Sequence, residues 1–233
     1  MTLAVETHAV TKKFPGVGWA LQGVDLSLEP GHILGFLGPN GSGKSTFLKI
    51  LAGIQRATSG QVLVLGLSPG IVTKRRAAYL PEIDHLYRWM TARDAIRFML
   101  AFYKDFDANR ASRLLQSLDV PPGQAFGQLS RGQRARLKLV LTLARQADLL
   151  LLDEPLSGID LLSRDRILNA ILAEYRIEDQ AIIMATHQIA EAEALFDRVA
   201  FIRDGRVLLE GAADDLRAAR GRSIEDIYRE EFA

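Results

Sequence analysis

The fold of this chain is decided by one stretch, Gly38-Pro39-Asn40-Gly41-Ser42-Gly43-Lys44-Ser45-Thr46. An apolar run, residues 32–37, precedes it, and an amphipathic stretch, residues 46–51, follows it. Between a strand and a helix, the pattern G-x-x-x-x-G-K-[ST] is the signal of a phosphate-binding loop. Its glycines let successive amides turn inward, and the helix N-terminus adds positive potential, so the loop binds a polyphosphate. The sequence therefore predicts a nucleoside triphosphate site.

Two side chains of this loop have specific expected contacts. Lys44 would reach the β- and γ-phosphates, and the Ser45 hydroxyl would bind Mg2+. The alternative is a glycine-rich turn that merely precedes a helix. The apolar strand before the loop and the amphipathic stretch after it argue against that alternative.

Composition limits the possible functions. The 233 residues include 29 basic and 28 acidic side chains, a net charge of +1, so no bulk field favours nucleic acid or an anionic membrane. The chain has no cysteine, which excludes disulfides, thiolate catalysis and zinc–thiolate sites. No apolar run approaches the roughly 18 residues of a membrane span, and residues 1–8 lack the features of a signal peptide. We expect a soluble, cytoplasmic protein that reaches a membrane only through a partner.

Hydrophobic periodicity predicts an α/β core with a helical insertion. Helical spacing runs from Thr91 to Leu118. The run Leu149–Leu152 is continuously apolar, as in a strand buried on both faces. Other strands are expected at 3–5, 24–28, 33–37, 61–66, 180–185, 198–203 and 206–210, and other helices at 161–176, 188–195 and 223–228.

Four further motifs follow the loop in a fixed order. They are Leu129-Ser130-Arg131-Gly132-Gln133, Asp153-Glu154 after the apolar run, Ser157-Gly158-Ile159-Asp160, and Ala185-Thr186-His187. With this set the chain resembles the ATP-binding-cassette (ABC) ATPases over nearly its whole length. The resemblance implies an α/β P-loop NTPase core with an N-terminal antiparallel β subdomain and an inserted α-helical subdomain. One domain would span 1–233, with the core at 1–83 and 141–233 and the helical subdomain at about 84–140.

The resemblance also implies roles for these motifs. Asp153 would hold Mg2+ directly or through water, Glu154 would polarise the attacking water, and His187 would bind the γ-phosphate. In the family, the signature (residues 129–133) closes over the ATP of a second subunit, and Asp160 lies at the same interface. Two chains would thus enclose two ATP molecules. Taken alone, Asp153-Glu154 is also compatible with an ordinary acidic strand end, and Ser130 with a simple helix cap.

Two positions depart from the common family pattern. Glu82 stands where a Gln usually follows Tyr-x-Pro; a carboxylate can still bind Mg2+ and accept from water. Its added charge needs compensation, for which Mg2+ is the expected source. Arg131 replaces a glycine of the signature, and its guanidinium would either face a partner's γ-phosphate or point into solvent. Both departures resemble the ATPases of ABC-2-type exporters.

The expected partners follow from the resemblance and from exposed apolar residues. Phe14 is the candidate for stacking on adenine, with Trp19 as the alternative. The apolar loop 83–90 would receive a separate membrane permease, unless Leu86 and Trp89 pack beneath the helical insertion.

We therefore expect the ATP-hydrolysing subunit of an ABC-2-type exporter, peripheral on the inner face of the membrane. A soluble ABC ATPase of translation or DNA repair is disfavoured by the single cassette, the lack of heptads and the neutral charge. A P-loop kinase would have no use for the signature or His187.

Overall fold

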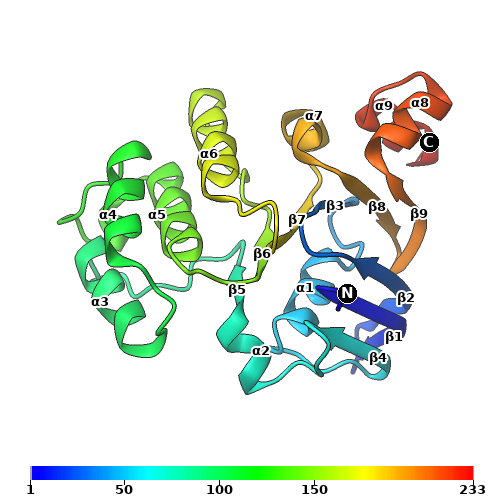
Figure 1. Cartoon of the computed structure of the whole chain (residues 1–233), viewed down its shortest axis with the longest axis horizontal. Helices are drawn as coiled ribbons and strands as arrows, with labels where there is room; N and C mark the ends of the chain where they lie inside the picture. Colours follow the sequence, from blue (N-terminus) through cyan, green and yellow to red (C-terminus); the bar gives the residue numbers. More distant parts are fainter. Residues whose placement is uncertain (1, 233) are drawn as a thin grey trace.

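A six-stranded sheet forms the centre of the molecule (Figure 1). The structure is a computed structural model that describes residues 2–232, apart from the side chains of residues 161 and 162. The strand order is β5 (Ala77–Leu80), β6 (Leu149–Asp153), β7 (Ala181–Thr186), β3 (Ile33–Leu37), β8 (Arg198–Arg203) and β9 (Arg206–Ala212). The first five run parallel, and β9 pairs antiparallel with β8. Every residue of β3, β6 and β7 is buried, which explains why their sequences are apolar up to Asp153 and Thr186 at the ends of β6 and β7.

A smaller antiparallel sheet carries the N-terminus. Its order is β2 (Gly18–Leu28), β1 (Val5–Phe14) and β4 (Ser59–Val64). The expected strands at 3–5 and 24–28 are much too short. Polar residues extend the hairpin, as in the pairs Thr11–Gln22 and Lys13–Trp19. These pairs complete the backbone ladder on a partly exposed sheet, so an apolar signal is not needed there.

Helix α1 (Lys44–Leu51) packs between the two sheets, where it contacts β6 and β7 on one side and β2 and β4 on the other. The opposite face of the large sheet is covered by several helices. They are α5 (Arg131–Leu143), α6 (Leu161–Glu174), α7 (Ile189–Ala192) with the 3-10 turn η2 (Glu193–Leu195), and α9 (Ile224–Phe232). The alternating side chains of β6 and β7 therefore belong to two cores, one on each face of the sheet.

A helical lobe extends from the side of the sheet that carries β5 and β6 (Figure 1). It consists of α3 (Ala92–Phe102), α4 (Ala108–Ser117), the 3-10 turn η1 (Phe126–Gln128) and α5. The predicted helical period from 91 to 118 is confirmed as two helices. Thr91 and Asp107 cap their N-termini by accepting backbone amides.

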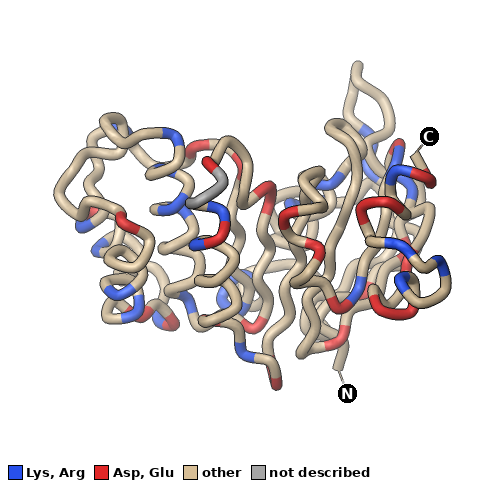
Figure 2. Tube along the Cα trace, turned by 90° about the horizontal axis from the view of Figure 1, so that it is seen from above, with Lys and Arg blue, Asp and Glu red and all other residues tan. Residues whose placement is uncertain are grey.

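Three short elements lay outside the sequence expectations: α2 (Ile71–Arg76), β5, and α8 (Ala213–Arg220). Helix α2 passes into β5 at Ala77 with no turn between them, so no Gly or Pro marks the boundary. Among the described helices, none has the length and apolarity needed to cross a membrane. Figure 2 shows basic and acidic residues interspersed over both ends of the molecule, in agreement with the net charge of +1.

Candidate active site

The predicted site residues of the core converge on one edge of the large sheet. Because β3, β5, β6 and β7 are parallel, their carboxyl ends meet at that edge. Loop 38–43 follows β3, and residues 81–84 follow β5. Asp153 ends β6 and is followed by Glu154, and His187 follows β7. Residues up to 149 positions apart in the chain, from 38 to 187, are thus brought to one place.

The loop has the shape of a phosphate cradle. A Cβ on Gly38 would lie 2.2 Å from the carbonyl oxygen of Ile202, and one on Gly43 would lie 2.4 Å from that of Ala20. Gly41 has a positive φ of 83° and no atom within 4 Å of the Cβ direction, so the tip of the loop is open. Helix α1 begins without a side-chain cap. Its first amides can therefore bind an anion, and the buried, unpartnered Ser42 Oγ offers a further polar contact.

Lys44 and Glu154 form a buried ion pair at the start of α1. Lys44 Nζ lies 3.4 Å from Glu154 Oε1 and donates to the carbonyl oxygens of Gly38 (2.7 Å) and Pro39 (3.1 Å). Burial lowers the pKa of Lys44, and the Glu154 carboxylate opposes that shift. The ammonium group is thus held at the phosphate cradle.

Glu154 is held from the other side by the end of β7. Its Oε1 is hydrogen-bonded to His187 Nδ1 at 2.9 Å, and its Oε2 accepts from Thr186 Oγ1 at 3.0 Å. The Glu154 side chain is 4% exposed and that of His187 is 37% exposed. The carboxylate therefore lies between Lys44 and a histidine that reaches solvent, as a group that handles a proton requires.

Asp153 is bound by two hydroxyl groups. Ser45 Oγ donates to Oδ1 at 2.8 Å, and Tyr79 OH donates to Oδ2 at 3.0 Å. Burial raises the pKa of Asp153 despite these two hydrogen bonds, and burial together with Asp153 raises that of Tyr79. Tyr79 belongs to the Tyr-x-Pro motif, but no sequence pattern indicates that its hydroxyl meets Asp153, because β5 was not expected. A carboxylate and a hydroxyl at this distance are suitable oxygen ligands for Mg2+.

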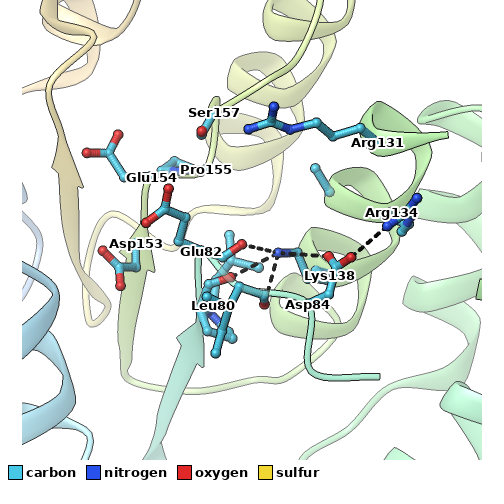
Figure 3. Close-up of a pocket in the computed structure, with 13 residues that line it drawn as sticks. Leu80, Glu82, Asp84, Arg131, Arg134, Lys138, Asp153, Glu154, Pro155 and Ser157 are labelled. Carbon is cyan, nitrogen blue, oxygen red and sulfur yellow. Dashed lines mark hydrogen bonds and ion pairs between the residues drawn. The ribbon is translucent and has the colours of Figure 1, made fainter. Parts of the chain in front are cut away.

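Glu82 lies beside the two acidic residues in a cavity of about 390 Å3 (Figure 3). The cavity is lined by the last residue of β5 and residues 81–84 after it, by Asp153 and Glu154, and by one face of α5. That face contributes Lys138, a residue the sequence motifs did not single out. Glu82 thus lines the same cavity as the predicted metal ligand Asp153, which is hydrogen-bonded to the predicted ligand Ser45. The described residues hold no cluster of three or more His, Cys, Asp or Glu side chains arranged for a metal, so the candidate ligands are two carboxylates and a hydroxyl.

The signature leads into the N-terminus of α5. It is far from the phosphate loop in the sequence and makes no hydrogen bond or ion pair with it among the described residues. Ser130 Oγ accepts from Gln133 N at 3.2 Å, and Gln133 Oε1 accepts from Ser130 N at 2.9 Å, which completes a capping box. Ser130 is exposed. Between described residues, no hydrogen bond or ion pair joins residues 130–133 to loop 38–46.

Arg131 is exposed, in agreement with one of its two expected arrangements, and it also contacts another segment of the same chain. Its guanidinium lies over Gly158 of the same chain, so that a Cβ on Gly158 would fall 2.1 Å from Arg131 Nε. Gly132 has open space around it. Asp160 caps α6, since its Oδ1 accepts from Ser163 N at 3.0 Å. Arg131 thus links the signature to the segment 157–160 within one subunit.

The two adenine candidates stand next to the turn of the β1–β2 hairpin, at residues 15–17. Lys12 Nζ lies 5.1 Å from the ring centroid of Phe14, and Lys13 Nζ lies 5.2 Å from that of Trp19. In loop 83–90, Leu86 packs against the core, whereas Trp89 is 68% exposed and stacks on Tyr87. The expectation of internal packing is therefore confirmed for Leu86 and wrong for Trp89.

Comparisons with known proteins agree with this geometry. The family model described as "ABC transporter" matches residues 21–157. The chain belongs to the ABC transporter family. It is 31% identical to a fluoroquinolones export ATP-binding protein of Mycobacterium tuberculosis, over 95% of this chain and 75% of that protein.

Two solved structures of ABC proteins have the same fold. One is described as an ATP-binding subunit of an ABC transporter; it is 25% identical, has a TM-score of 0.87, and the match covers 99% of this chain and 100% of that one. The other is a dimeric ATP-binding cassette bound to ADP and Pi after hydrolysis; it is 23% identical, has a TM-score of 0.80, and the match covers 89% and 98%. The expected α/β cassette fold is confirmed. The chain is the ATP-binding, ATP-hydrolysing subunit of an ABC transporter, and the soluble alternative is not favoured.

Proposed function

We propose that this subunit powers an ABC-2-type exporter by closing onto a second ATPase subunit around two ATP molecules. The observation that carries the proposal is that the predicted ATP-site residues of this chain lie in two separate places. One edge of the sheet gathers Lys44, Glu154 and His187, while no hydrogen bond or ion pair between described residues joins residues 130–133 of the signature to the phosphate loop. The 31% identity to an export ATP-binding protein supports export as the direction of transport.

ATP binding is assigned to the loop and its neighbours. The residues of the phosphate cradle are Gly38, Pro39, Asn40, Gly41, Ser42, Gly43, Lys44, Ser45 and Thr46. The proposed Mg2+ ligands are Ser45, Asp153 and Glu82, directly or through water. When bound, Mg2+ neutralises charge on the phosphate oxygens. Stacking of adenine on Phe14 completes the nucleotide site.

Glu154 is the proposed general base. The carboxylate is buried and is oriented on both sides by Lys44 and by the end of β7. A base fixed in this way can accept the proton of the attacking water. His187, at its side and reaching solvent, is proposed to bind the γ-phosphate.

The signature residues Ser130, Arg131, Gly132 and Gln133, together with Asp160, are proposed to meet the nucleotide of the second subunit. Ser130 is exposed at the N-terminus of a 13-residue helix, where amides and helix dipole favour an anion. The second subunit is either an identical chain or a close relative. Its signature would in turn complete this chain's own phosphate loop.

A separate membrane permease is the proposed second partner, and it would hold this subunit at the inner face of the membrane. The exposed side chains of Ile83 (67%), Tyr87 (65%) and Trp89 (68%) follow directly after Glu82. An apolar surface next to a metal ligand would let a docked permease sense the state of the nucleotide. We assign this role to the helical subdomain, about residues 84–140, inserted in a core of residues 1–83 and 141–233.

Light scattering of Glu154→Gln with ATP and Mg2+ tests the proposed closure. The variant should form a stable dimer with ATP and remain monomeric with ADP, because the amide cannot accept the proton that hydrolysis releases. Adding Lys44→Ala to the same chain should abolish the dimer by removing ATP binding. An identical mass with and without ATP, in a variant shown to bind ATP, would refute closure as the working step.

The adenine assignment has its own matched pair of variants. Phe14→Ala should weaken ATP binding about tenfold, a typical cost for a lost stacking partner. Trp19→Ala should leave the affinity unchanged. The reverse order, measured by equilibrium titration, would transfer the role to Trp19.

A further inference from the structure

A buried lysine on the signature helix holds the turn that carries Glu82. Lys138 is 6% exposed, although lysine is rarely buried. Its Nζ donates to the carbonyl oxygens of three consecutive residues: Pro81 at 3.1 Å, Glu82 at 2.6 Å and Ile83 at 3.2 Å. These contacts use the three N–H groups of the ammonium. The turn after β5 is thus tied by its backbone to α5 (Figure 3).

A second cation one turn earlier on α5 reinforces the connection. Arg134 Nη1 donates to Asp84 Oδ2 at 2.8 Å, and Asp84 Oδ1 lies 3.7 Å from Lys138 Nζ. Arg134 also donates from Nε to the carbonyl oxygen of Leu129, the first residue of the signature. The turn and the signature are therefore joined through the same helix.

The backbone contacts leave the side chain of Glu82 free. Figure 3 shows it directed toward Asp153 and Glu154, with the Lys138 ammonium behind the turn. The cavity there is lined by four carboxylates, those of Glu82, Asp84, Asp153 and Glu154. Like charges that share one site repel one another.

Lys138 is well placed to offset this repulsion. Burial lowers the pKa of Lys138, and the nearby carboxylates of Asp84, Glu82 and Asp153 oppose that shift. A buried cation is tolerated only when it is hydrogen-bonded and paired, and both conditions hold here.

We infer that Lys138 is a positioning residue, which fixes the 81–84 turn and supplies the positive charge that the carboxylate at position 82 requires. This inference rests on the proposed function for its catalytic consequence, but the geometry itself does not. From the sequence, Mg2+ is the expected source of positive charge to compensate Glu82. In the inferred arrangement, Lys138 supplies part of that charge. Because Lys138 belongs to the signature helix, a shift of that helix would move Glu82 relative to Asp153.

A double-mutant cycle between Lys138 and Glu82 tests the inference without nucleotide. Lys138→Gln should lower the Tm of the wild-type chain. It should lower the Tm clearly less when Glu82 is already Gln, since the charge to be offset is then absent. Glu178→Gln, an exposed acid elsewhere, is the control and should not reduce the loss. Equal losses of Tm in all three backgrounds would overturn the inference.

The catalytic consequence is read from steady-state ATP hydrolysis. Lys138→Gln should lower kcat about tenfold, because the turn loses its anchor. It should also lower the Mg2+ concentration needed for half-maximal rate, because the carboxylates then attract the divalent cation more strongly. Lys138→Arg, which keeps the charge, should keep most of the rate and the Mg2+ requirement. Glu82→Gln added to Lys138→Gln should recover part of kcat. A purely structural role for Lys138 would leave the Mg2+ requirement unchanged.

Failure to fold is also informative. If Lys138→Gln unfolds and the double variant with Glu82→Gln folds, the pairing is supported. If both unfold, as judged by circular dichroism, the charge of Glu82 is not what Lys138 offsets. If the wild type neither binds nor hydrolyses ATP, the proposed function fails, while the thermal cycle still decides the pairing.

Discussion

Glu154 has a φ of 49°, in the left-handed region that residues with a side chain avoid. Such a conformation costs about 1–2 kcal/mol. Here it aims the carboxylate at Lys44 and His187, while Asp153, one residue earlier, faces Ser45 and Tyr79. Adjacent acidic residues thereby acquire separate partners and can have separate roles. Local strain at this position is consistent with a functional site.

Replacing Glu154 with Gln should separate ATP binding from ATP hydrolysis. The amide keeps the shape of the side chain but accepts no proton, so we expect kcat to fall by about 10² to 10⁴. Phosphate release gives the rate, and equilibrium titration gives the ATP affinity. Asp165→Asn, an exposed acid on α6, is the control. A Glu154→Gln enzyme with normal turnover would assign the base to another group.

Asp153 makes the stability of the metal-free protein depend on pH. Burial raises the pKa of Asp153 above its ordinary value of 3.8. Because this pKa is higher in the folded than in the unfolded protein, ionisation of Asp153 lowers the free energy of unfolding as the pH rises from 3.8 through the folded-state pKa. Below 3.8 the carboxyl group is protonated in both states, and this cost is absent. Without metal or nucleotide, Asp153→Asn should therefore have a higher Tm than the wild type at pH 7, and the difference should vanish toward pH 3.8.

Addition of ATP and Mg2+ should reverse that order, because the wild type gains a ligand and the variant does not. The measurement is a Tm series by differential scanning fluorimetry across pH, with and without both ligands. A wild type that stays more stable than Asp153→Asn at pH 7 in a metal chelator would show that the two hydroxyl bonds outweigh burial.

Helix α5 has a capped N-terminus that is closely similar to that of α3. Ser130 with Gln133 and Thr91 with Asp94 are both capping boxes. Loss of either cap should cost about 1 kcal/mol of folding stability. Only α5, however, is expected to face a second subunit.

Variants at the two caps should therefore differ in assembly. In the Glu154→Gln background with ATP, Ser130→Arg should prevent the dimer, because the larger side chain fills the space of the partner's γ-phosphate. Thr91→Ala should lose stability and keep the dimer. Light scattering measures both. An ATP-dependent dimer that survives Ser130→Arg would exclude the signature from the interface.

Segment 157–160 packs against the signature through Gly158. This residue has a φ of 71°, and a Cβ would overlap the Arg131 guanidinium. Gly158→Ala should lower the free energy of unfolding by about 1–2 kcal/mol from the backbone alone, and by more while Arg131 is present. Arg131→Ala should remove the additional part.

Gly132→Ala is the matched control for this prediction, since the added methyl would meet no atom within 4 Å. In a helix this change should be neutral or stabilising by about 0.5–1 kcal/mol. Urea unfolding of the variants measures the differences. If Gly158→Ala lowers the free energy of unfolding by the same amount with and without Arg131, the contact between the two segments does not contribute to stability.

The large-scale order of the chain follows from sequence wherever one physical rule dominates. The apolar runs 33–37 and 149–152 could be recognised as strands because both of their faces are buried. The site edge followed in turn, since parallel strands end together. Extended polar strands, such as most of β1, and the four residues of β5 could not be recognised, because backbone pairing alone defines them.

The finer arrangement of the site depended on contacts between distant elements. The hydrogen bond from Tyr79 to Asp153, the grip of Lys138 on residues 81–83 and the contact of Arg131 with Gly158 each join two elements whose relative placement no local pattern encodes. The motifs thus identified the main reacting groups, and the fold added the residues that orient them.

In the proposed ATP-bound dimer, the phosphate edge of one subunit is completed by the signature of the other subunit. The decisive measurement is the ATPase rate per subunit over a dilution series, with the dimer fraction followed by light scattering in the same samples. We predict that the rate per subunit falls in proportion to the dimer fraction and approaches zero for monomers. A rate per subunit that stays constant at dilutions where only monomers scatter would contradict the account.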